Sequence, residues 1–526
     1  MRCRNCDKAN SQCTFLLPLR PRGPKPRTDH RYAELQSSPS ENNREAEDQV
    51  VNSHAQGQNS FTQQASLSAS LPTATTTSVP EQSFEPASLL MHDRSYATDV
   101  LFPRDLVQFV LQDYVTYVYP VVPVIHIPTF KDNLSREHDS ENQDFLSLVF
   151  SLCALTISLL PSRFRFYREH ESPLPFKTRT EVANHCYNLN QSLRDIEYWD
   201  TVSHQKWASS YLLALTFHQT GNANLWRMLE VESMQLLRLL EVQHSSNYAG
   251  LDAIETQLRK KAFWLMFYAY IHHTHSYRDE RVTFLDPMIL QEIKLEELMP
   301  APVDDEYISS AGILPCPEDV SANSMAAGFI IHSRIFSAAR MHNPLCSCPQ
   351  SKDPTMRIAR LQEQLYQLKY MLDTVQPIYR PWNKKANALA PATEDNSLPS
   401  IQREVIRANI QTTRLWLQIV LLDQIDNTIR EPTGSVSSPE DSASLTVSSP
   451  QLPPFPQIQT RESAWDEREN VCRELLHAIH SFSRSALEPN GNGLVSGSQY
   501  TADSLPAVKS LRADLQLVYV PRRRER

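Results

Sequence analysis

Residues 252–271 read DAIETQLRKKAFWLMFYAYI, and this stretch decides the fold. Asp252 and Glu255 have the spacing of a capping box, in which two side chains satisfy free amide groups at the start of a helix. Glu255 also stands four residues before Arg259, a spacing that lets their charges pair on one helical face. After Ala262 the helix is apolar on nearly every side, which is typical of a buried helix. The sequence therefore predicts that this helix forms the centre of an all-α domain.

Apolar residues also recur at helical spacing on the N-terminal side of this stretch. Gly221 divides one such region into two stripes, which predicts a hairpin of two helices over 205–242. Pro123 and Pro128 interrupt helical hydrogen bonding, so the sequence predicts an extended connector over 120–130. The other helices predicted here run from about residue 101 to Tyr119 and from Asp144 to Leu160.

The C-terminal half contains one heptad-like run between Pro354 and Pro377. Such a run forms either a core helix of the same chain or the seam of a dimer, because both structures bury a stripe at this spacing. The sequence alone leaves both interpretations open. The run consists of Ile358, Leu361, Leu365, Leu368, Leu372 and Val375.

The rest of the chain divides by composition. Residues 32–94 are rich in Ser, Thr, Gln and Asn and poor in large apolar side chains, which predicts a disordered linker. A helical domain is predicted over 95–487, interrupted by a disordered Ser- and Pro-rich loop at 432–460. Within this domain a long helix is predicted over 401–429 and a last helix over 464–486, and an irregular tail follows over 488–526.

Composition argues against several classes of protein. Ten glycines in 526 residues are few, which disfavours the glycine-rich loops that bind phosphates and dinucleotides. The strongly apolar stretch 145–160 is shorter than the roughly twenty residues of a membrane-spanning helix. Six of the nine cysteines are scattered through the domain without a disulfide pattern, as in proteins of reducing compartments. We recognise no nucleophile elbow, P-loop or zincin helix, so the sequence does not indicate an enzyme.

The N-terminus contains the pattern Cys3-x2-Cys6-x6-Cys13. Two close thiolates and a third one loop away are typical of one corner of a structural zinc site. In the basic run that follows, prolines keep the chain extended and its charges apart, which suits contact with phosphates. Residues 1–31 hold eight Lys and Arg against two Asp, a net charge of +6; because the whole chain carries −9, the remaining residues carry −15. Only this arm is expected to face nucleic acid, through Arg20, Arg22, Lys25, Arg27 and Arg31.

This N-terminal pattern resembles the second half of the binuclear zinc cluster of fungal six-cysteine transcription factors. In that family two such halves hold two zinc ions through six thiolates, and the first half carries the helix that reads bases. The sequence begins inside the loop between the halves, so the resemblance is to a finger that lacks its base-reading half. The resemblance implies that Cys3, Cys6 and Cys13 bind zinc and that the basic run contacts the DNA backbone.

A second resemblance connects the predicted central helix to the same family. A Glu, a basic triplet and Phe-Trp, followed further along by Leu-x-Pro-x-x-Val-Asp-Asp, are similar to the signature of its fungal-specific regulatory domain. A helix and the proline-rich residues after it, over 114–130, are similar to the opening of that domain. Residues 280–282 read Glu-Arg-Val where the family usually has Gly-Arg-Pro, a modest departure. The signature positions are Glu255, Arg259, Phe263, Trp264, Pro300, Val303, Asp304 and Asp305.

The resemblance implies a nuclear regulator that binds DNA and controls RNA polymerase II genes of a metabolic pathway, such as a secondary-metabolite cluster or the use of a carbon source. It implies zinc as the cofactor, with DNA and the transcription machinery as partners. A homodimer and a small-molecule effector are also consistent with the family, and no membrane association is expected.

Two other interpretations stay open. Without the base-reading half, the chain could act without DNA contact, through a ligand or a partner protein. A helical metalloenzyme is the remote alternative, since imidazole and carboxylate groups gather after the predicted central helix. Polar residues at the point where a buried helix reaches solvent would explain the same pattern, which comprises His272, His273, His275 and Asp279.

Overall fold

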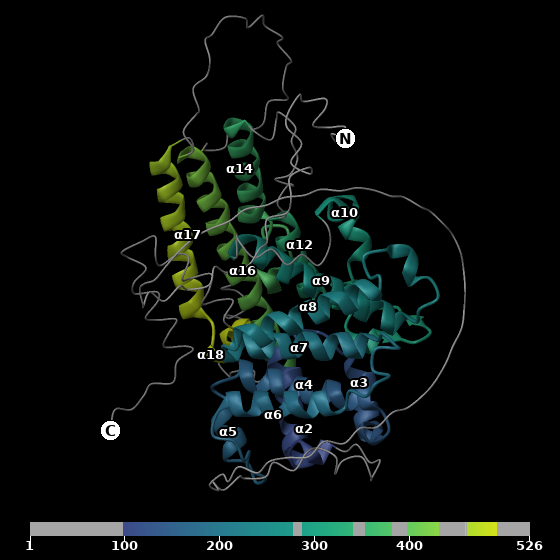
Figure 1. Ribbon diagram of the computed structural model, residues 1–526. Helices are drawn as coiled ribbons and strands as arrows, with labels where there is room; N and C mark the ends of the chain where they lie inside the picture. Colours follow the sequence, from purple (N-terminus) through teal and green to yellow (C-terminus); the bar gives the residue numbers. More distant parts are fainter. Residues whose placement is uncertain are drawn as a thin grey trace, which may run out of the picture. The chain divides into compact units, whose positions relative to one another are not determined.

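The computed structural model describes residues 98–276, 287–339, 353–380, 397–430, 458 and 460–491 (Figure 1). These residues belong to one unit of the chain, Ser83–Arg526. Several predictions lie outside the described residues: the cysteine pattern and basic run of 1–31, the linker 32–94, Asp279 and the side chain of His275, most of the loop 432–460, and the tail beyond residue 491.

The fold is all-α, as the sequence predicts. Within the described ranges, strands are limited to β1 (Ile308–Ser309) and β2 (Gly312–Ile313), which pair antiparallel with Ile308 opposite Ile313. In that part of the chain no helix combines the length and the apolar character needed to cross a lipid bilayer.

Helix α4 (Gln143–Leu159) is the centre of a first group of helices and confirms the helix predicted over 144–160. Nearly all of its side chains are buried because its sequence is apolar on every side. Its neighbours are α2 (Arg104–Asp113), α6 (Arg179–Ser192) and α7 (His204–Thr220), which lie beside it in Figure 1.

The helical hairpin predicted over 205–242 is confirmed as α7 and α8 (Ala223–Leu239). Gly221 ends α7 with φ +84°, a conformation that glycine adopts without the steric cost met by other residues. Asn222 then caps α8 by accepting a hydrogen bond from the amide of Leu225 (3.3 Å). The turn therefore uses the Gly221 that the sequence singles out, followed by the Asn222 cap.

Helix α9 (Ala253–Ser276) confirms the prediction of a central buried helix. Phe263, Trp264 and Phe267 are fully buried. The helix contacts α7 and α8 on one side and α12 (Met325–Ala338) on the other, so both groups of helices pack against it.

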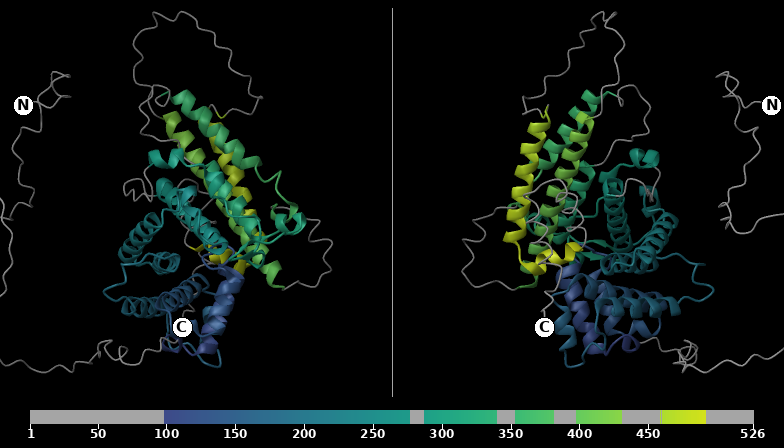
Figure 2. Two further views of the ribbon diagram at one scale, coloured as in Figure 1. Left: turned by 90° about the vertical axis from the view of Figure 1, so that its right-hand side faces the viewer. Right: turned by 60° about the vertical axis from the view of Figure 1, so that its left-hand side comes forward.

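Helix α16 (Leu398–Arg430) is the centre of a second group, in which it packs against α12, α14 (Pro354–Tyr370) and α17 (Arg461–Ser481) (Figure 2). The heptad-like run lies mainly on α14, and its apolar stripe is buried where α14 meets α16. The run therefore packs inside its own chain, which favours the core-helix interpretation over a dimer seam. The buried members of the stripe within α14 are Leu361, Leu365 and Leu368.

The prediction of an extended connector over 120–130 is wrong in its second half, because α3 (Ile127–Ser135) begins there. Pro128 occupies the first turn of α3, where a missing N–H costs nothing and a fixed φ favours the helix. The ring of His126 caps the helix by accepting a hydrogen bond from the amide of Thr129 (3.4 Å). Here proline marks the start of a helix and not a break.

The predictions for the C-terminal part need two corrections. The helix predicted over 464–486 is divided at Phe482, whose backbone is extended, into α17 and α18 (Arg484–Leu487). The tail predicted to be irregular from residue 488 begins with a helical turn, η10 (Glu488–Asn490).

The sequence predicts an irregular tail at Glu488 and a disordered loop at Ile458, whereas both residues are buried. The Glu488 carboxylate accepts hydrogen bonds from the Ser162 hydroxyl (2.6 Å) and from the Arg484 guanidinium (2.8 Å). The carbonyl of Ile458 accepts one from the Gln362 amide (2.6 Å). Periodicity misses such residues because a single buried side chain in a polar segment repeats nothing.

Apolar periodicity does not predict α6 or α12 either. The sequence of α6 is mostly polar, and that of α12 is apolar on most sides. η4 (Tyr114–Val118) continues α2 as a π-helix, so this helix reaches Tyr119 as predicted. The shorter elements are η3 (Thr98–Val100), η5 (His138–Ser140), α5 (Phe164–Arg168), η6 (Ser245–Tyr248), α10 (Pro287–Glu292), η7 (Leu295–Leu298), η8 (Asp305–Tyr307), α11 (Glu318–Ala322) and η9 (Pro377–Tyr379).

Two buried histidines make the fold sensitive to acid. Burial lowers the pKa of His204 to about 4 and that of His332 to about 3. The unfolded chain protonates these rings near pH 6.5, whereas the folded chain keeps them neutral. Between these values the unfolded state binds more protons, so the free energy of unfolding falls as the pH falls.

Lowering the pH from 7 to 5 is therefore expected to cost about 2 kcal/mol for each buried histidine. Urea unfolding of the chain at both pH values measures this loss. His332→Gln should remove about 2 kcal/mol of it, whereas His244→Gln, at an exposed histidine, should leave it unchanged. If the His332→Gln protein lost as much stability between pH 7 and pH 5 as its parent, burial of a neutral His332 would not be a cause of the acid sensitivity.

Candidate functional site

The first turns of α9 present the polar residues of the sequence signature. Asp252 Oδ1 accepts a hydrogen bond from the amide of Glu255 (2.8 Å), which forms one half of the predicted capping box. The Glu255 carboxylate does not return a bond to Asp252; it accepts one from Arg259 Nε (2.7 Å), as the four-residue spacing predicts. These contacts set the start of the helix and the direction of the side chains that follow.

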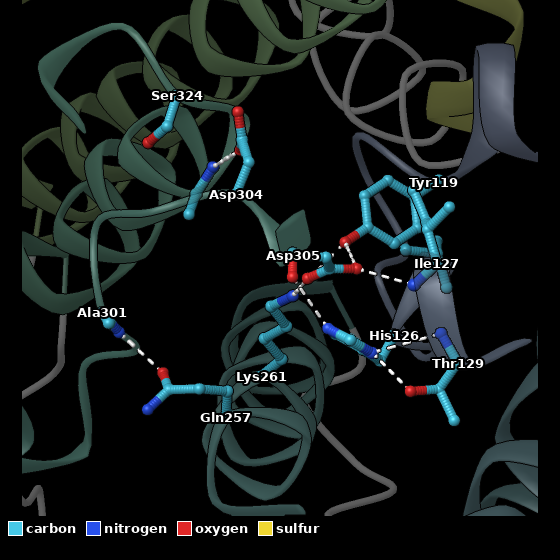
Figure 3. A network of polar contacts seen from close by, with 12 residues as sticks. Tyr119, His126, Ile127, Thr129, Gln257, Lys261, Ala301, Asp304, Asp305 and Ser324 are labelled. Carbon is cyan, nitrogen blue, oxygen red and sulfur yellow. Dashed lines mark hydrogen bonds and ion pairs between the residues drawn. The ribbon is translucent and has the colours of Figure 1, made fainter. Parts of the chain in front are cut away.

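Lys261 and Asp305 form a buried ion pair at the centre of the site (Figure 3). Lys261 Nζ lies 2.9 Å from Asp305 Oδ1, and the two side chains are 6% and 3% exposed. Lys261 comes from α9, and Asp305 begins the short helix η8. Two charges so deeply buried are tolerated only when they neutralise each other and their remaining hydrogen-bonding atoms find partners.

The other atoms of Asp305 bind the connector between α2 and α3 (Figure 3). Its Oδ2 accepts hydrogen bonds from the Tyr119 hydroxyl (2.6 Å) and from the amide of Ile127 (2.8 Å). Its main-chain oxygen lies 2.8 Å from His126 Nε2. A single aspartate therefore ties together the 119–127 connector and α9.

The charge state of this aspartate follows from its partners. Burial alone would raise the pKa of Asp305, but the Lys261 ammonium, the Tyr119 hydroxyl and the Ile127 amide outweigh it and lower the pKa below its ordinary value of 3.8. Asp305 is therefore ionised at neutral pH. Its ionisation stabilises the fold fully above about pH 4, and this stabilisation is lost as the pH falls through the lowered pKa.

The pKa of Tyr119 is raised, whereas that of Asp305 is lowered. Burial first, and then the adjacent Asp305 charge, hold the pKa of Tyr119 well above 10. The phenol therefore keeps its proton and donates it to the carboxylate in a hydrogen bond. Together these shifts fix one arrangement, in which an ammonium and a phenol both face an ionised carboxylate.

The polar side of α9 also holds the segment before Asp305. Trp264 Nε1 donates to the carbonyl of Leu298 (3.0 Å). Lys260 Nζ donates to the carbonyls of Glu297 (2.9 Å) and Met299 (3.2 Å), so it is more than the surface cation that its position suggests. Further along this segment, the Ala301 amide donates a hydrogen bond to Gln257 Oε1 (2.7 Å). Pro300 and Val303 of the same segment are buried.

Asp304 is placed differently from its neighbour. Its Oδ1 accepts one long hydrogen bond from the amide of Ala326 (3.3 Å) at the start of α12. Burial raises the pKa of Asp304. The two adjacent acids of the signature therefore have separate structural roles, one at an ion pair and one at a helix start.

A cavity of about 20 Å³ adjoins the ion pair, lined by residues that include Tyr119, Lys261 and Asp304. Such a volume holds about one water molecule. The ionised groups are enclosed by protein and leave no room for a substrate. This arrangement joins three segments of the chain and does not present its charges to a ligand.

The histidines after the centre of α9 do not converge. The ring of His272 stacks on Trp416 with centroids 4.3 Å apart, whereas His273 Nε2 lies 2.7 Å from Glu230 Oε1 on α8. Among the residues that the structure describes, no three His, Cys, Asp or Glu side chains are placed to hold one metal ion. His273 is buried, so the explanation of a helix reaching solvent also needs correction at this residue.

A second hollow lies between α2 and α3. It has a volume of about 370 Å³, and its floor includes the buried Leu111, Val115 and Phe130. Polar side chains, among them Gln108 and Lys131, stand at its rim. The volume falls in the range of small-molecule sites, whereas the lining is more polar than such sites usually have.

Comparison of the chain with protein-family models, with curated proteins and with solved structures found no match. The sequence resemblance therefore stands on the residues themselves. The predicted signature residues lie in separate interactions, with Asp305 in the ion pair, Trp264 bound to Leu298 and Asp304 at the start of α12. The predicted zinc ligands and DNA-contacting cations lie outside the described residues.

Sequence reasoning missed Tyr119, Gln257 and Glu230 as members of polar networks. The sequence marks Tyr119 as the last residue of a predicted helix and as part of the 114–130 stretch, but neither indicates an acidic partner. A buried lysine within the triplet 259–261 would have pointed to an acidic partner, but the sequence does not show which of the three cations faces the core.

Proposed function

We propose that the chain is a nuclear, DNA-binding regulator of transcription that acts on RNA polymerase II genes of a metabolic pathway. In this proposal the helical unit is the regulatory domain, zinc bound by Cys3, Cys6 and Cys13 orders the N-terminus, and the basic run contacts DNA.

One observation carries the proposal. The three stretches that resemble the regulatory domain, at 114–130, 255–264 and 298–305, are distant in sequence and meet at the Lys261–Asp305 pair and its hydrogen bonds. Of the residues in these stretches, Tyr119, Lys261 and Asp305 belong to the buried network itself. The distribution of charge along the chain also supports the proposal, because residues 1–31 carry a net charge of +6 and the remaining residues carry −15.

DNA binding by the chain tests the proposal. Fluorescence anisotropy with a mixed-sequence duplex is expected to show weak binding. The logarithm of the binding constant should fall with the logarithm of the salt concentration at a slope of about −4.5, since about five cations each contribute about −0.9. Replacing Arg20, Arg22, Lys25, Arg27 and Arg31 with Ala should abolish this binding. The parent chain should bind no more than one zinc ion, because Cys3, Cys6 and Cys13 supply too few thiolates for two sites.

The matched control neutralises the cations at the other end of the chain, Arg522, Arg523, Arg524 and Arg526. Their loss should leave the salt slope near that of the parent. No binding by the parent, or an equal loss in the control, would contradict a role of the N-terminal run.

A regulator that acts through a ligand and without DNA contact is the second candidate. The α2–α3 hollow of about 370 Å³ favours it, because small-molecule sites fall in this range of volumes. Failure of the parent chain to bind DNA, together with saturable binding of a small molecule in that hollow, would favour this candidate over the first.

A further inference from the structure

The hollow between α2 and α3 has an apolar floor and a polar rim. Arg104 Nη2, at the start of α2, donates a hydrogen bond to the carbonyl of Leu134 near the end of α3 (3.0 Å), and this contact closes one end of the hollow. The floor consists of the buried Leu111, Val115 and Phe130 and the half-buried Leu134. The volume of about 370 Å³ is that of about twelve molecules of liquid water, so it suits a ligand with roughly that many non-hydrogen atoms or somewhat more.

Three side chains at the rim carry polar groups that the fold does not use. Lys131, Gln108 and Glu137 are exposed, and among the described residues none of them makes a hydrogen bond or an ion pair through its side chain. Arg104 differs, because it holds Leu134 and its Nη1 lies 3.8 Å from the fully buried carboxylate of Asp139. One ammonium and one carboxylate are therefore available to a molecule in the hollow.

The backbone at Glu137 indicates that its carboxylate has a role. Glu137 follows the end of α3 in a left-handed conformation, with φ +57°. Helices commonly place glycine or asparagine there, because other side chains meet a steric cost. Within the described ranges the other such residue is Glu241, whose carboxylate accepts a hydrogen bond from Asn247 Nδ2 (2.6 Å). The Glu137 carboxylate has no comparable contact there, so binding accounts for its position better than stability does.

The two available charges are opposite in sign and stand apart. In the described structure Lys131 and Glu137 form no ion pair with each other. Glu137 follows Lys131 by six residues, which is about 9 Å along a helix axis. A ligand with a single charge would leave one of the two groups without a partner, whereas a zwitterion supplies both. An extended peptide spans about 3.5 Å per residue, so two or three residues match this separation.

We propose that the α2–α3 hollow binds a short peptide of two or three residues that has apolar side chains and free ends. The peptide carboxylate binds the Lys131 ammonium, and the peptide ammonium binds the Glu137 carboxylate. The apolar side chains of the peptide cover the floor at Phe130 and its neighbours. This inference rests on the second candidate function, a regulator that responds to a ligand, and it requires neither DNA nor zinc.

Isothermal titration calorimetry of the full chain with leucyl-leucine tests the site, and saturable binding is expected. N-acetyl-leucyl-leucine lacks the ammonium, and leucyl-leucine amide lacks the carboxylate. Each should bind at least about tenfold more weakly, the effect of losing one charge-assisted hydrogen bond. Glycyl-glycine keeps both charges but has no apolar side chains, so it should show no measurable binding.

Two variants assign the ends of the peptide. Lys131→Gln should bind leucyl-leucine and its amide equally, because the group that distinguishes them is gone, and it should still discriminate against the acetylated form. Glu137→Gln should show the reverse. Both residues are exposed, so neither change should disturb the fold. Lys177→Gln is the matched control, since Lys177 is an exposed lysine outside the hollow, and it should keep the Kd of the parent for every peptide.

Several outcomes would overturn the proposal. No binding of leucyl-leucine, together with saturable binding of a different small molecule that Lys131→Gln weakens, would exclude the peptide and keep the second candidate function. Equal binding of a peptide blocked at both ends would show that the hollow takes a segment of a longer chain. Tighter binding of leucine than of leucyl-leucine would replace the peptide with a single amino acid. Unchanged discrimination in Lys131→Gln and Glu137→Gln, or an equal effect of Lys177→Gln, would place the site elsewhere.

Discussion

Replacing Trp264 with Ala is expected to lower the free energy of unfolding by about 3–5 kcal/mol, the usual cost of removing a buried aromatic side chain. The indole is fully buried in α9, and its ring centre lies 5.7 Å from that of Phe263 and 5.2 Å from that of Phe267. Its N–H also holds the carbonyl of Leu298. The substitution removes packing against Phe263 and Phe267 together with one tie to the signature segment.

Urea unfolding of the full chain measures this effect. Trp264→Phe should cost less, because it keeps an aromatic ring. The cost that remains comes from the buried carbonyl of Leu298, which loses its donor. Trp465→Ala is the matched control, since Trp465 on α17 is 38% exposed, and it should cost well under the Trp264 value. If Trp264→Ala unfolded at the same urea concentration as the parent, α9 would not be the centre of the fold.

Replacing Asp305 with Ala should also cost about 3–5 kcal/mol, because it leaves the Lys261 ammonium buried without its counter-charge. The Tyr119 hydroxyl and the Ile127 amide lose their acceptor in the same step. Denaturant unfolding gives the magnitude, and limited proteolysis at the 119–127 connector should become faster.

The neighbouring acid provides the control for this prediction. Asp304→Ala removes an identical side chain that makes one long hydrogen bond to Ala326 and whose pKa is raised by burial. Its cost should be about 1 kcal/mol or less, because folding already disfavours its charge. Equal costs at the two positions would show that the ion pair has no special weight.

Periodicity predicted most of the long helices because each of these repeats apolar residues on the face that it buries. α7, α8, α14 and α16 follow this rule, whereas α4 and α9 were predictable from runs that are apolar on nearly every side. The bounds of these helices differ from the predicted ones by a few residues. The rule does not reach α3, where Pro128 starts a helix, or Glu488, where burial depends on a hydroxyl and a guanidinium from other segments. Apolar periodicity does not register a proline in the first turn of a helix, and the contact between Ser162 and Glu488 joins residues that are distant in sequence.

The sequence predicted some members of the candidate site, Asp305 among them, but not Lys261 or Tyr119 and not the connections between them. Asp304 and Asp305 are adjacent and identical in type, yet only Asp305 faces Lys261. Which of two neighbouring acids is buried depends on the turn into η8, and this turn is set by the hydrogen bonds to the 119–127 connector. Tyr119 and His126 could not be assigned to the network for the same reason, because they meet Asp305 only in the folded chain.

The meeting of three distant segments at one buried ion pair is tested most directly by a double-mutant cycle between Lys261 and Asp305. Unfolding free energies of Lys261→Met, Asp305→Leu and the double variant give the coupling between the two side chains. We expect a coupling above about 2 kcal/mol, with the double variant less destabilised than Asp305→Leu alone, because two apolar groups replace an unpaired buried charge. Additive effects within about 0.5 kcal/mol would contradict a direct contact between α9 and Asp305.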